Sequence, residues 1–344
     1  MGASLSHGLL SGRGPWRRIA VLRPGRIGDY LCATPAVRAL KRAVPHARLD
    51  YVGLPLVRDL VVRNPYVDRF VPFPGFPNIA EQFFEPRRAV SWLARMQAER
   101  YDLVVQLYGS GVYANPIALL LGGRCCAGFV RHRHDGAPGL DAAVPLPGQG
   151  PEVDRALALV RHLGAGVAGR AYDLRLCPAD RAAADRALRG LPRPVLGLHA
   201  GARDDGRRVA PEVLGRAASR LGECSVVVLG GPEERGAGAR VAAAVEGPVC
   251  RNLAGVTPLA VAAAVVAGLD ALLTTDSAPA HLAYAVGTPS VTLFLDSDPT
   301  RWGPPVPGPH TLLDCRERDP DPAALADQAR RLLDGAAQAV TTRG

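Results

Sequence analysis

The sequence predicts an α/β protein built from two doubly wound domains, each with a mostly parallel sheet. Short apolar runs alternate with segments of helical spacing in both halves of the chain, a pattern typical of parallel strands covered by helices on both faces. The alternation pauses at residues 172–178 and then restarts. A length of 344 residues with 48% hydrophobic residues suits two such cores.

The first half contains five predicted strands and four predicted helices. Thr34 and Pro35 are typical of a helix N-cap and first turn, although some helix could begin near Asp29. The stretch 131–151 is rich in Gly, Pro, His and Arg and predicts a loop. Strands are expected at 19–22, 49–52, 67–71, 103–107 and 125–129, and helices at 34–44, 87–99, 115–121 and 153–163.

The second half repeats the alternation. A G-x-G-x-x-G run at 164–169 precedes it, but this run follows a helical pattern and not a strand, so we interpret it as a helix end and linker. Strands are expected at 195–199, 225–229, 269–274 and 290–294, and helices at 211–221, 233–245, 259–266, 280–286 and 322–339. The predicted organisation is a disordered tail at 1–18, domains at 19–172 and 173–321, and a final helix within 322–344.

The charge pattern excludes several function classes. The formal net charge is +9, but Lys41 is the only lysine and the arginines are scattered along the chain, so we expect a coding bias and no nucleic-acid partner. The chain lacks the Gly-Lys-Ser/Thr sequence that a P-loop needs. A Schiff-base enzyme would have to use Lys41.

The seven cysteines include no C-x-x-C pair and predict reduced thiols in a cytosolic protein, with no disulfide framework or zinc site. No apolar run reaches 18 residues, so no transmembrane helix is expected. At the N-terminus, a myristoylation pattern and a weak signal peptide compete with a disordered tail, which we favour. The His-Arg-His-Asp run at 132–135 lacks zinc-motif spacing and is interpreted as a loop facing solvent or substrate.

The loop after the first predicted strand carries candidate chemistry. It reads Arg-Pro-Gly-Arg-Ile-Gly-Asp at 23–29, and its glycines allow the backbone to approach a ligand closely. Asp29 lies at or near a helix N-terminus, where a carboxylate is stabilised. The sequence alone leaves two interpretations of Asp29 open, a helix cap and a functional group.

Three segments of the second half follow adjacent predicted strands. The segment 274–281 (Thr-Thr-Asp-Ser-Ala-Pro-Ala-His) starts a helix, whose free amides and dipole suit a diphosphate. Arg207 or Arg208 could hold phosphate oxygens, and a glutamate at 233–234 could accept hydrogen bonds from a ribose. Each segment alone is compatible with a cap or a solvated loop, but together they favour a nucleoside diphosphate.

Taken in order, these motifs resemble those of glycosyltransferase family 9, the ADP-heptose:lipopolysaccharide heptosyltransferases and their relatives. The resemblance covers nearly the whole chain after residue 18 and implies the GT-B fold, in which two Rossmann-like domains face a central cleft and the last helix crosses back to the first domain. Residues 19–172 would bind the acceptor and residues 173–321 the nucleotide sugar. The motifs are Arg-x-Gly-Asp at 26–29, His-x-Gly-Ala at 199–202, Asp-Ser-Ala-Pro-Ala-His-Leu-Ala at 276–283, Gly-Thr-Pro at 287–289 and Asp-Pro-Thr-Arg-Trp-Gly-Pro at 298–304.

The resemblance also implies roles for individual residues. Asp29 matches the family's catalytic base, and Arg207 falls at or near its basic phosphate-binding position. Glu234 matches a ribose-binding glutamate, and His281 a histidine on the helix behind the sugar and diphosphate loop. The acceptor side comprises Arg23, Arg26 and Gly28, and the nucleotide-sugar side comprises Gly201, Ala202, Arg207, Arg208, Glu234, Asp276, Ser277, Ala278 and His281. Arg-Arg-Val at 207–209 departs from a common Lys-Arg-Trp, and Leu-Asp at 295–296 from a frequent Gly-Pro.

The activity implied by the resemblance is an inverting glycosyltransferase that needs no metal and no cofactor. It would move a heptose from ADP-heptose to a hydroxyl of a cell-envelope glycan or glycolipid, and a small natural product is an alternative acceptor. Alternatives of other classes are a sugar-nucleotide epimerase and a catalytically silent nucleotide-sugar-binding protein. We expect a cytoplasmic monomer, with peripheral contact to the inner membrane face as an option.

Overall fold

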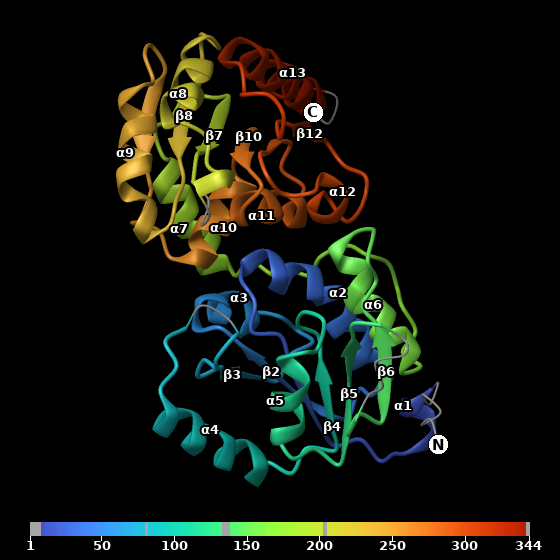
Figure 1. The fold of residues 1–344 in the computed structure, drawn as a ribbon. Helices are drawn as coiled ribbons and strands as arrows, with labels where there is room; N and C mark the ends of the chain where they lie inside the picture. The colour runs from blue at the N-terminus through green and yellow to red at the C-terminus, as the bar shows by residue number, and fades with distance from the viewer. Residues whose placement is uncertain (1–7, 80–81, 133–137, 202–204, 342–344) are drawn as a thin grey trace. The chain divides into compact units, whose positions relative to one another are not determined.

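The computed structural model of the chain divides into two compact units, Met1–Arg175 and Leu176–Gly344 (Figure 1). The division falls inside the junction predicted at 172–178. Each unit has its own sheet and its own hydrophobic core. The structure describes residues 8–79, 82–132, 138–201 and 205–341, and none of the helices in these ranges is both long and apolar enough to cross a membrane.

The first unit contains a six-stranded parallel sheet in the order β3-β2-β1-β4-β5-β6. The chain starts at a central strand and winds outward in both directions, so the sheet is doubly wound. Its strands are β1 (Arg18–Leu22), β2 (Arg48–Gly53), β3 (Arg69–Pro72), β4 (Leu103–Gln106), β5 (Cys125–Val130) and β6 (Ala142–Pro145). Its helices are α1 (Leu9–Gly12), α2 (Ile27–Ala43), α3 (Arg58–Val61), α4 (Pro86–Ala98), α5 (Ala114–Leu120) and α6 (Glu152–His162).

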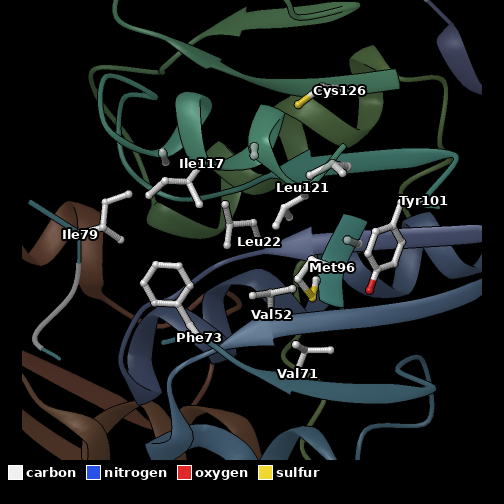
Figure 2. Packing of buried hydrophobic residues seen from close by; sticks show 14 of the residues in the cluster. Leu22, Val52, Val71, Phe73, Ile79, Met96, Tyr101, Ile117, Leu121 and Cys126 are labelled. Carbon is white, nitrogen blue, oxygen red and sulfur yellow. The ribbon is translucent and has the colours of Figure 1, made fainter. Parts of the chain in front are cut away.

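Alternate residues of the strands build the core of the first unit. Leu22 of β1 and Val52 of β2 are fully buried and lie in one cluster with Phe73, Met96 of α4 and Ile117 of α5 (Figure 2). Burial of each such side chain stabilises the fold by roughly 1.5–3 kcal/mol. The opposite face of the sheet is covered by α2 and α6, which pack against each other. The strand ends, and the loops that follow them, are therefore held by packed layers on both sides.

Helix α2 begins earlier than the Thr-Pro pattern indicated. It starts at Ile27, so Pro35 lies inside it. Proline has no N–H, which deprives the Leu31 carbonyl of its helical donor. The Thr34 hydroxyl instead donates to that carbonyl at 2.7 Å. Thr34 thus supplies the hydrogen bond that Pro35 cannot make, and it does not cap the helix. Asp29 lies in the first turn.

The tail expected to be disordered, residues 1–18, packs against the first unit from residue 8 onward, whereas residues 1–7 lie outside the described part. Leu9 and Trp16 are 2% and 8% exposed. The Gly8 amide donates to the His162 carbonyl at the end of α6 at 2.9 Å. For residues 8–18 the prediction was wrong, because two apolar side chains that form no periodic pattern anchor a segment whose other residues are largely exposed.

The glycine-rich run at 164–169 ends a helix, as predicted. Gly164 follows α6 with φ +96°, a left-handed conformation that favours glycine. The run neither follows a strand nor opens a helix, so it lacks the context of a dinucleotide-binding fingerprint.

The second unit contains a six-stranded parallel sheet in the order β12-β11-β10-β7-β8-β9, which is the same winding as in the first unit. Helices α7, α10 and α11 pack together, as do α8, α9 and α13. Its strands are β7 (Val195–His199), β8 (Ser225–Val228), β9 (Val249–Asn252), β10 (Ala271–Thr275), β11 (Ser290–Phe294) and β12 (His310–Asp314). Its helices are α7 (Pro178–Leu188), α8 (Pro211–Ser219), α9 (Arg235–Ala243), α10 (Leu259–Ala267), α11 (Ala278–Val286), α12 (Pro299–Trp302) and α13 (Pro322–Thr341).

The final helix, α13, packs within the second unit. Leu325, Ala329 and Leu333 recur every four residues and are buried in that unit's core, where α13 contacts α8 and β10. The sequence resemblance predicted that the helix within 322–344 crosses back to the first domain. The apolar stripe of residues 325–333 is covered by the helix's own unit.

Three strands, β6, β9 and β12, were not expected from the sequence. All three lie at an edge of a sheet. The residues of β9 and β12 are half-buried or exposed, so their apolar signal is weak. Strand β6 lies within the stretch 131–151, which was predicted to be a loop. Helix α7 was also missed, since it begins at the predicted junction.

Candidate active site

Asp29 lies in the first turn of α2, directly after the loop that follows β1. Its Oδ2 accepts a hydrogen bond from the Arg26 amide at 3.0 Å, so Asp29 does act as a cap. Its side chain is nevertheless 28% exposed, which leaves the carboxylate accessible. Gly25 makes this packing possible, because a Cβ at that position would lie 2.5 Å from the Cβ of Asp29. The two interpretations of Asp29 are therefore compatible with each other.

Arg23 holds the other oxygen of this carboxylate. Its Nη2 lies 3.0 Å from Asp29 Oδ1 and 3.0 Å from Glu152 Oε1. Arg23 is 3% exposed. Burial alone would lower the pKa of this guanidinium, but the two carboxylates outweigh burial and raise the pKa above its ordinary value. Arg23 was predicted to lie on the acceptor side, yet its buried side chain contacts protein groups.

Sequence reasoning missed Glu152, the first residue of α6. It is 4% exposed and lies 123 positions after Asp29 in the chain. No motif marks it, because an acidic residue in the first turn of a helix is common and is read as a cap. The partly exposed residues predicted near Asp29, Arg26 and Gly28, lie in the same loop and first turn.

A polar cavity of about 440 Å³ opens at the carboxyl ends of β4 and β5. Strand β4 is the neighbour of β1, so the cavity and the Asp29 loop share one edge of the sheet. Ser110, Asn115, Arg131 and His132 contribute polar groups to its lining. His132 belongs to the run at 132–135 whose other members lie outside the described residues. The interpretation of His132 as part of a substrate-facing loop fits this position.

Glycine at position 25 avoids a clash with Asp29. We expect the Gly25→Ala variant to lose at least about tenfold in turnover, because the new methyl group displaces the Asp29 carboxylate. Gly148→Ala is the matched control, since a Cβ there meets nothing within 4 Å. Steady-state kinetics and the melting temperature of both variants check this. Unchanged turnover in Gly25→Ala would mean that the position of Asp29 is not critical.

In the second unit, His199 connects three of the predicted segments. It is the last residue of β7 and is 2% exposed. Its Nε2 lies 3.2 Å from Glu234 Oε2, and its Nδ1 lies 3.1 Å from the Ser277 hydroxyl. A carboxylate can only accept a hydrogen bond, so Nε2 carries a proton towards Glu234, and Nδ1 also faces the Thr274 hydroxyl at 3.3 Å. The predicted site residues did not include His199, although it begins the His-x-Gly-Ala motif.

Glu234 lies after β8 and is held by two donors. Besides His199, the Gly231 amide donates to Glu234 Oε2 at 2.6 Å. Partial burial would raise the pKa of Glu234, but hydrogen bonds from His199 and Gly231 and the positive charge of Arg208 lower it below the ordinary value. The side chain stays 26% exposed. It is thus an oriented carboxylate that remains available to accept hydrogen bonds.

Gly201 keeps this carboxylate in place. A Cβ at position 201 would lie 1.8 Å from Glu234 Oε1, so only glycine fits without displacing the glutamate. The Gly201 carbonyl accepts a hydrogen bond from the Thr275 hydroxyl at 2.7 Å, which ties the β7 loop to the end of β10. Ala202 lies outside the described residues. Arg207 is half-buried and Arg208 exposed, and both have polar or charged neighbours.

The loop between β10 and α11 contains the remaining predicted residues. Ser277 is the N-cap of α11 and Ala278 its first residue. Pro279 has no N–H, and the amides of Ala280 and His281 donate to the Ser277 carbonyl, so the amides that lack a helical acceptor here are those of Ser277 and Ala278. Asp276 is 4% exposed, accepts a hydrogen bond from the Ser297 hydroxyl, and has His281 Nε2 at 3.8 Å from its Oδ1. His281 in turn contacts the ring of Trp302, with centroids 5.9 Å apart.

The structure thus brings Glu234, Ser277 and Gly201 together around His199, with Asp276 and His281 in the adjoining loop and helix. A carboxylate, a hydroxyl and helix amides at the carboxyl end of a parallel sheet can bind the ribose and diphosphate of a nucleotide. Among the residues that the structure describes, no three His, Cys, Asp or Glu side chains cluster as a metal site would require.

Comparisons with known proteins show the family of the chain. Residues 90–317 match the family described as glycosyltransferase family 9 (heptosyltransferase). The chain is 28% identical to lipopolysaccharide heptosyltransferase 2 of Salmonella typhimurium over 303 residues, covering 82% of this chain and 84% of the relative. It is 25% identical to lipopolysaccharide heptosyltransferase 3 of Escherichia coli over 289 residues, covering 80% and 83%.

A solved structure shares the fold. The ADP-heptose lipopolysaccharide heptosyltransferase II of E. coli superposes with a TM-score of 0.76, at 22% identity, over 93% of this chain and 99% of that one. This supports the GT-B architecture predicted from the motifs, two α/β units that each contain a parallel six-stranded sheet.

Proposed function

The chain belongs to glycosyltransferase family 9, and on that premise we propose that it transfers a heptose from ADP-heptose to an acceptor hydroxyl of a cell-envelope glycan or glycolipid, with inversion and without a metal ion. Membership of this family makes the chain a glycosyltransferase. The identity of its donor, the identity of its acceptor and the inversion of configuration are what we propose. The relatives named lipopolysaccharide heptosyltransferases support the choice of a heptose. The name of the E. coli structure supports ADP-heptose as the donor.

The observation that carries the proposal is the exposed carboxylate of Asp29. One of its oxygens accepts from the Arg26 amide and the other from Arg23, so the side chain is oriented while part of it faces solvent. Such a carboxylate can take the proton of the acceptor hydroxyl as that oxygen attacks the anomeric carbon. The bond from the anomeric carbon to the diphosphate oxygen breaks as the new glycosidic bond forms. Attack on the face opposite the leaving group inverts the anomeric centre.

The second unit binds the donor in this proposal. Glu234 accepts hydrogen bonds from the ribose hydroxyls, as acidic residues do in other nucleotide-binding α/β folds. The amides of Ser277 and Ala278 at the start of α11 and the positive charge of Arg207 stabilise the negative charge that develops on the departing ADP. These groups supply the electrostatic stabilisation that a metal ion gives in other transferases. Asp276 lies in the same loop and is a buried carboxylate that accepts from Ser297 and has His281 beside it.

The acceptor side belongs to the first unit. The cavity at the ends of β4 and β5 is lined by Arg131 and Ser110, whose guanidinium and hydroxyl suit a hydroxyl-rich acceptor that also carries anionic groups. Neither residue was predicted from the motifs. Their place on the same sheet edge as the Asp29 loop supports the assignment.

We expect the purified protein, in buffer containing EDTA, to form ADP and a heptosylated product when it is given ADP-heptose and a heptose-deficient lipopolysaccharide core. Thermal unfolding with ADP, UDP and GDP tests the donor base, since a ligand present at 100 times its Kd stabilises the fold by about 2.7 kcal/mol. We expect ADP to raise the melting temperature more than UDP or GDP does.

Mass spectrometry of the product and its anomeric configuration by NMR complete this test. Conversion of the donor without an acceptor would indicate an epimerase. Binding of ADP with no turnover on any acceptor would indicate a silent binding protein. Activity that disappears in EDTA and returns with a divalent cation would contradict metal independence.

A further inference from the structure

We infer that Glu152 is a positioning residue for Asp29 and acts through the buried guanidinium of Arg23, which the two carboxylates share. The inference rests on the proposed function, because it takes Asp29 to be the base. Glu152 itself does not touch substrate in this account. Its effect on the reaction passes through Arg23.

The geometry makes Arg23 the common partner of both acids. A single nitrogen, Nη2, lies 3.0 Å from Asp29 Oδ1 and 3.0 Å from Glu152 Oε1. The side chains of Arg23 and Glu152 are 4% and 5% exposed, whereas that of Asp29 is 28% exposed. Of these three groups, only Asp29 is therefore open enough to meet an acceptor. The other two form its buried support.

Burying Glu152 needs a physical reason, because an ionised carboxylate away from water is costly unless it is paired. The reason is a second arginine in the next turn of α6. Arg155 Nη1 lies 3.3 Å from Glu152 Oε2, so the two oxygens of Glu152 face two different cations. The resulting chain of side chains, Asp29, Arg23, Glu152 and Arg155, alternates in sign and sums to zero charge.

Sharing the cation has a consequence for a base. If Arg23 interacted with Asp29 alone, the full attraction of a buried guanidinium would stabilise the carboxylate and make it a poor acceptor of a proton. Glu152 takes part of that attraction and adds a negative charge nearby. Asp29 is thus held in a fixed orientation by a cation whose attraction it shares with Glu152. Asp29 meets the acceptor, and Glu152 balances part of the charge of Arg23.

The other groups around this cluster do not titrate near neutral pH. Burial raises the pKa of Tyr51, whose hydroxyl faces the Arg23 carbonyl at 3.4 Å. Burial likewise raises the pKa of the Cys32 thiol on α2, which contacts the Tyr172 hydroxyl at 3.0 Å. Arginine side chains, including those of Arg26 and Arg155, stay protonated in this range. A change in the acidic limb of the pH–rate profile can therefore be attributed to the carboxylates.

The test is the Glu152→Gln variant of the full chain, which keeps the shape of the side chain and removes its charge. Arg23 then attracts Asp29 alone, so Asp29 stays ionised to lower pH. We expect the acidic limb of kcat against pH to move down by about one pH unit. We also expect kcat at neutral pH to fall about tenfold, with the KM values for donor and acceptor within twofold of the wild type.

Two further variants separate positioning from a structural role. Glu99→Gln removes another carboxylate of the first unit that is shared by two arginines, Arg48 and Arg69, and should leave the pH profile unchanged. The double variant Arg23→Gln/Glu152→Gln removes the cation as well and should move the acidic limb above that of the wild type. If Glu152→Gln alone does not fold, the acidic limb of the double variant still tests whether the cation of Arg23 acts on Asp29.

The possible outcomes are distinct. An acidic limb that stays in place in Glu152→Gln, with a loss only of melting temperature, overturns the inference and leaves the proposed function intact. Retained turnover in Asp29→Asn, measured in parallel, overturns the assignment of the base instead. Opposite movements of the limb in the single and double variants support the shared-cation arrangement.

Discussion

The Asp29→Asn variant is expected to lose about 10²–10⁴-fold in turnover while its affinity for ADP stays within twofold of the wild type. Asparagine keeps an oxygen that can accept from the Arg26 amide, so the start of α2 should stay folded. It cannot take a proton from the acceptor at neutral pH. The groups predicted to bind the nucleotide all belong to the other unit of the chain, so the substitution leaves them unaltered.

Single-turnover kinetics with saturating donor measure this effect, and calorimetry with ADP measures the affinity. The matched control is Asp59→Asn, since Asp59 also lies in the first turn of a helix of the first unit but is exposed. This control should keep its full activity. If both variants were equally active, Asp29 would be a helix cap and nothing more.

The second large effect concerns the contact between His199 and Glu234. Hydrogen bonds to charged groups contribute about 1.5–3 kcal/mol. We expect either His199→Ala or Glu234→Ala to weaken ADP binding by about 10–100-fold, since a loss of 1.4 kcal/mol corresponds to a factor of ten. The double variant should bind only about as weakly as the weaker single variant, because each substitution removes the same oriented carboxylate.

A matched control is available in the same sheet. His310 on β12 forms a hydrogen bond of 2.9 Å with the Ser290 hydroxyl. Burial lowers the pKa of His310 to about 4. His310→Ala should therefore leave ADP binding unchanged even if it lowers the melting temperature. Strictly additive losses in the His199 and Glu234 variants would show that the two residues act independently, contrary to the geometry.

The central strands were predicted correctly because their residues are apolar on both faces. β1, β4, β7, β10 and β11 are buried along nearly all of their length, and their polar residues stand at strand ends, apart from the β-branched Thr292 in β11. The edge strands β6, β9 and β12 were missed for the opposite reason. The residues of β9 and β12 are half-buried or exposed, and β6 is a four-residue strand inside a stretch rich in turn-forming residues, so none of the three gives a strong apolar signal.

The candidate site divides in a similar way. Asp29, Glu234 and Ser277 were found because each belongs to a local motif beside a glycine or a helix start. Glu152 and His199 were missed because their roles depend on long-range contacts. Glu152 lies 129 positions from Arg23, and His199 lies 78 positions from Ser277. The Thr-Pro pattern gave a start of α2 that is too late, because the hydroxyl of Thr34 compensates for the proline, whereas the alternative start near Asp29 agrees with the structure.

The identical winding of the two sheets has a consequence for how such a protein can diversify. Each unit completes its own sheet and buries its own core, and the groups assigned to the acceptor and to the donor are distributed one set to each unit. Substitutions that alter the choice of acceptor therefore act on residues that play no part in folding the nucleotide-binding unit. Selection can change what is glycosylated and leave untouched what supplies the sugar.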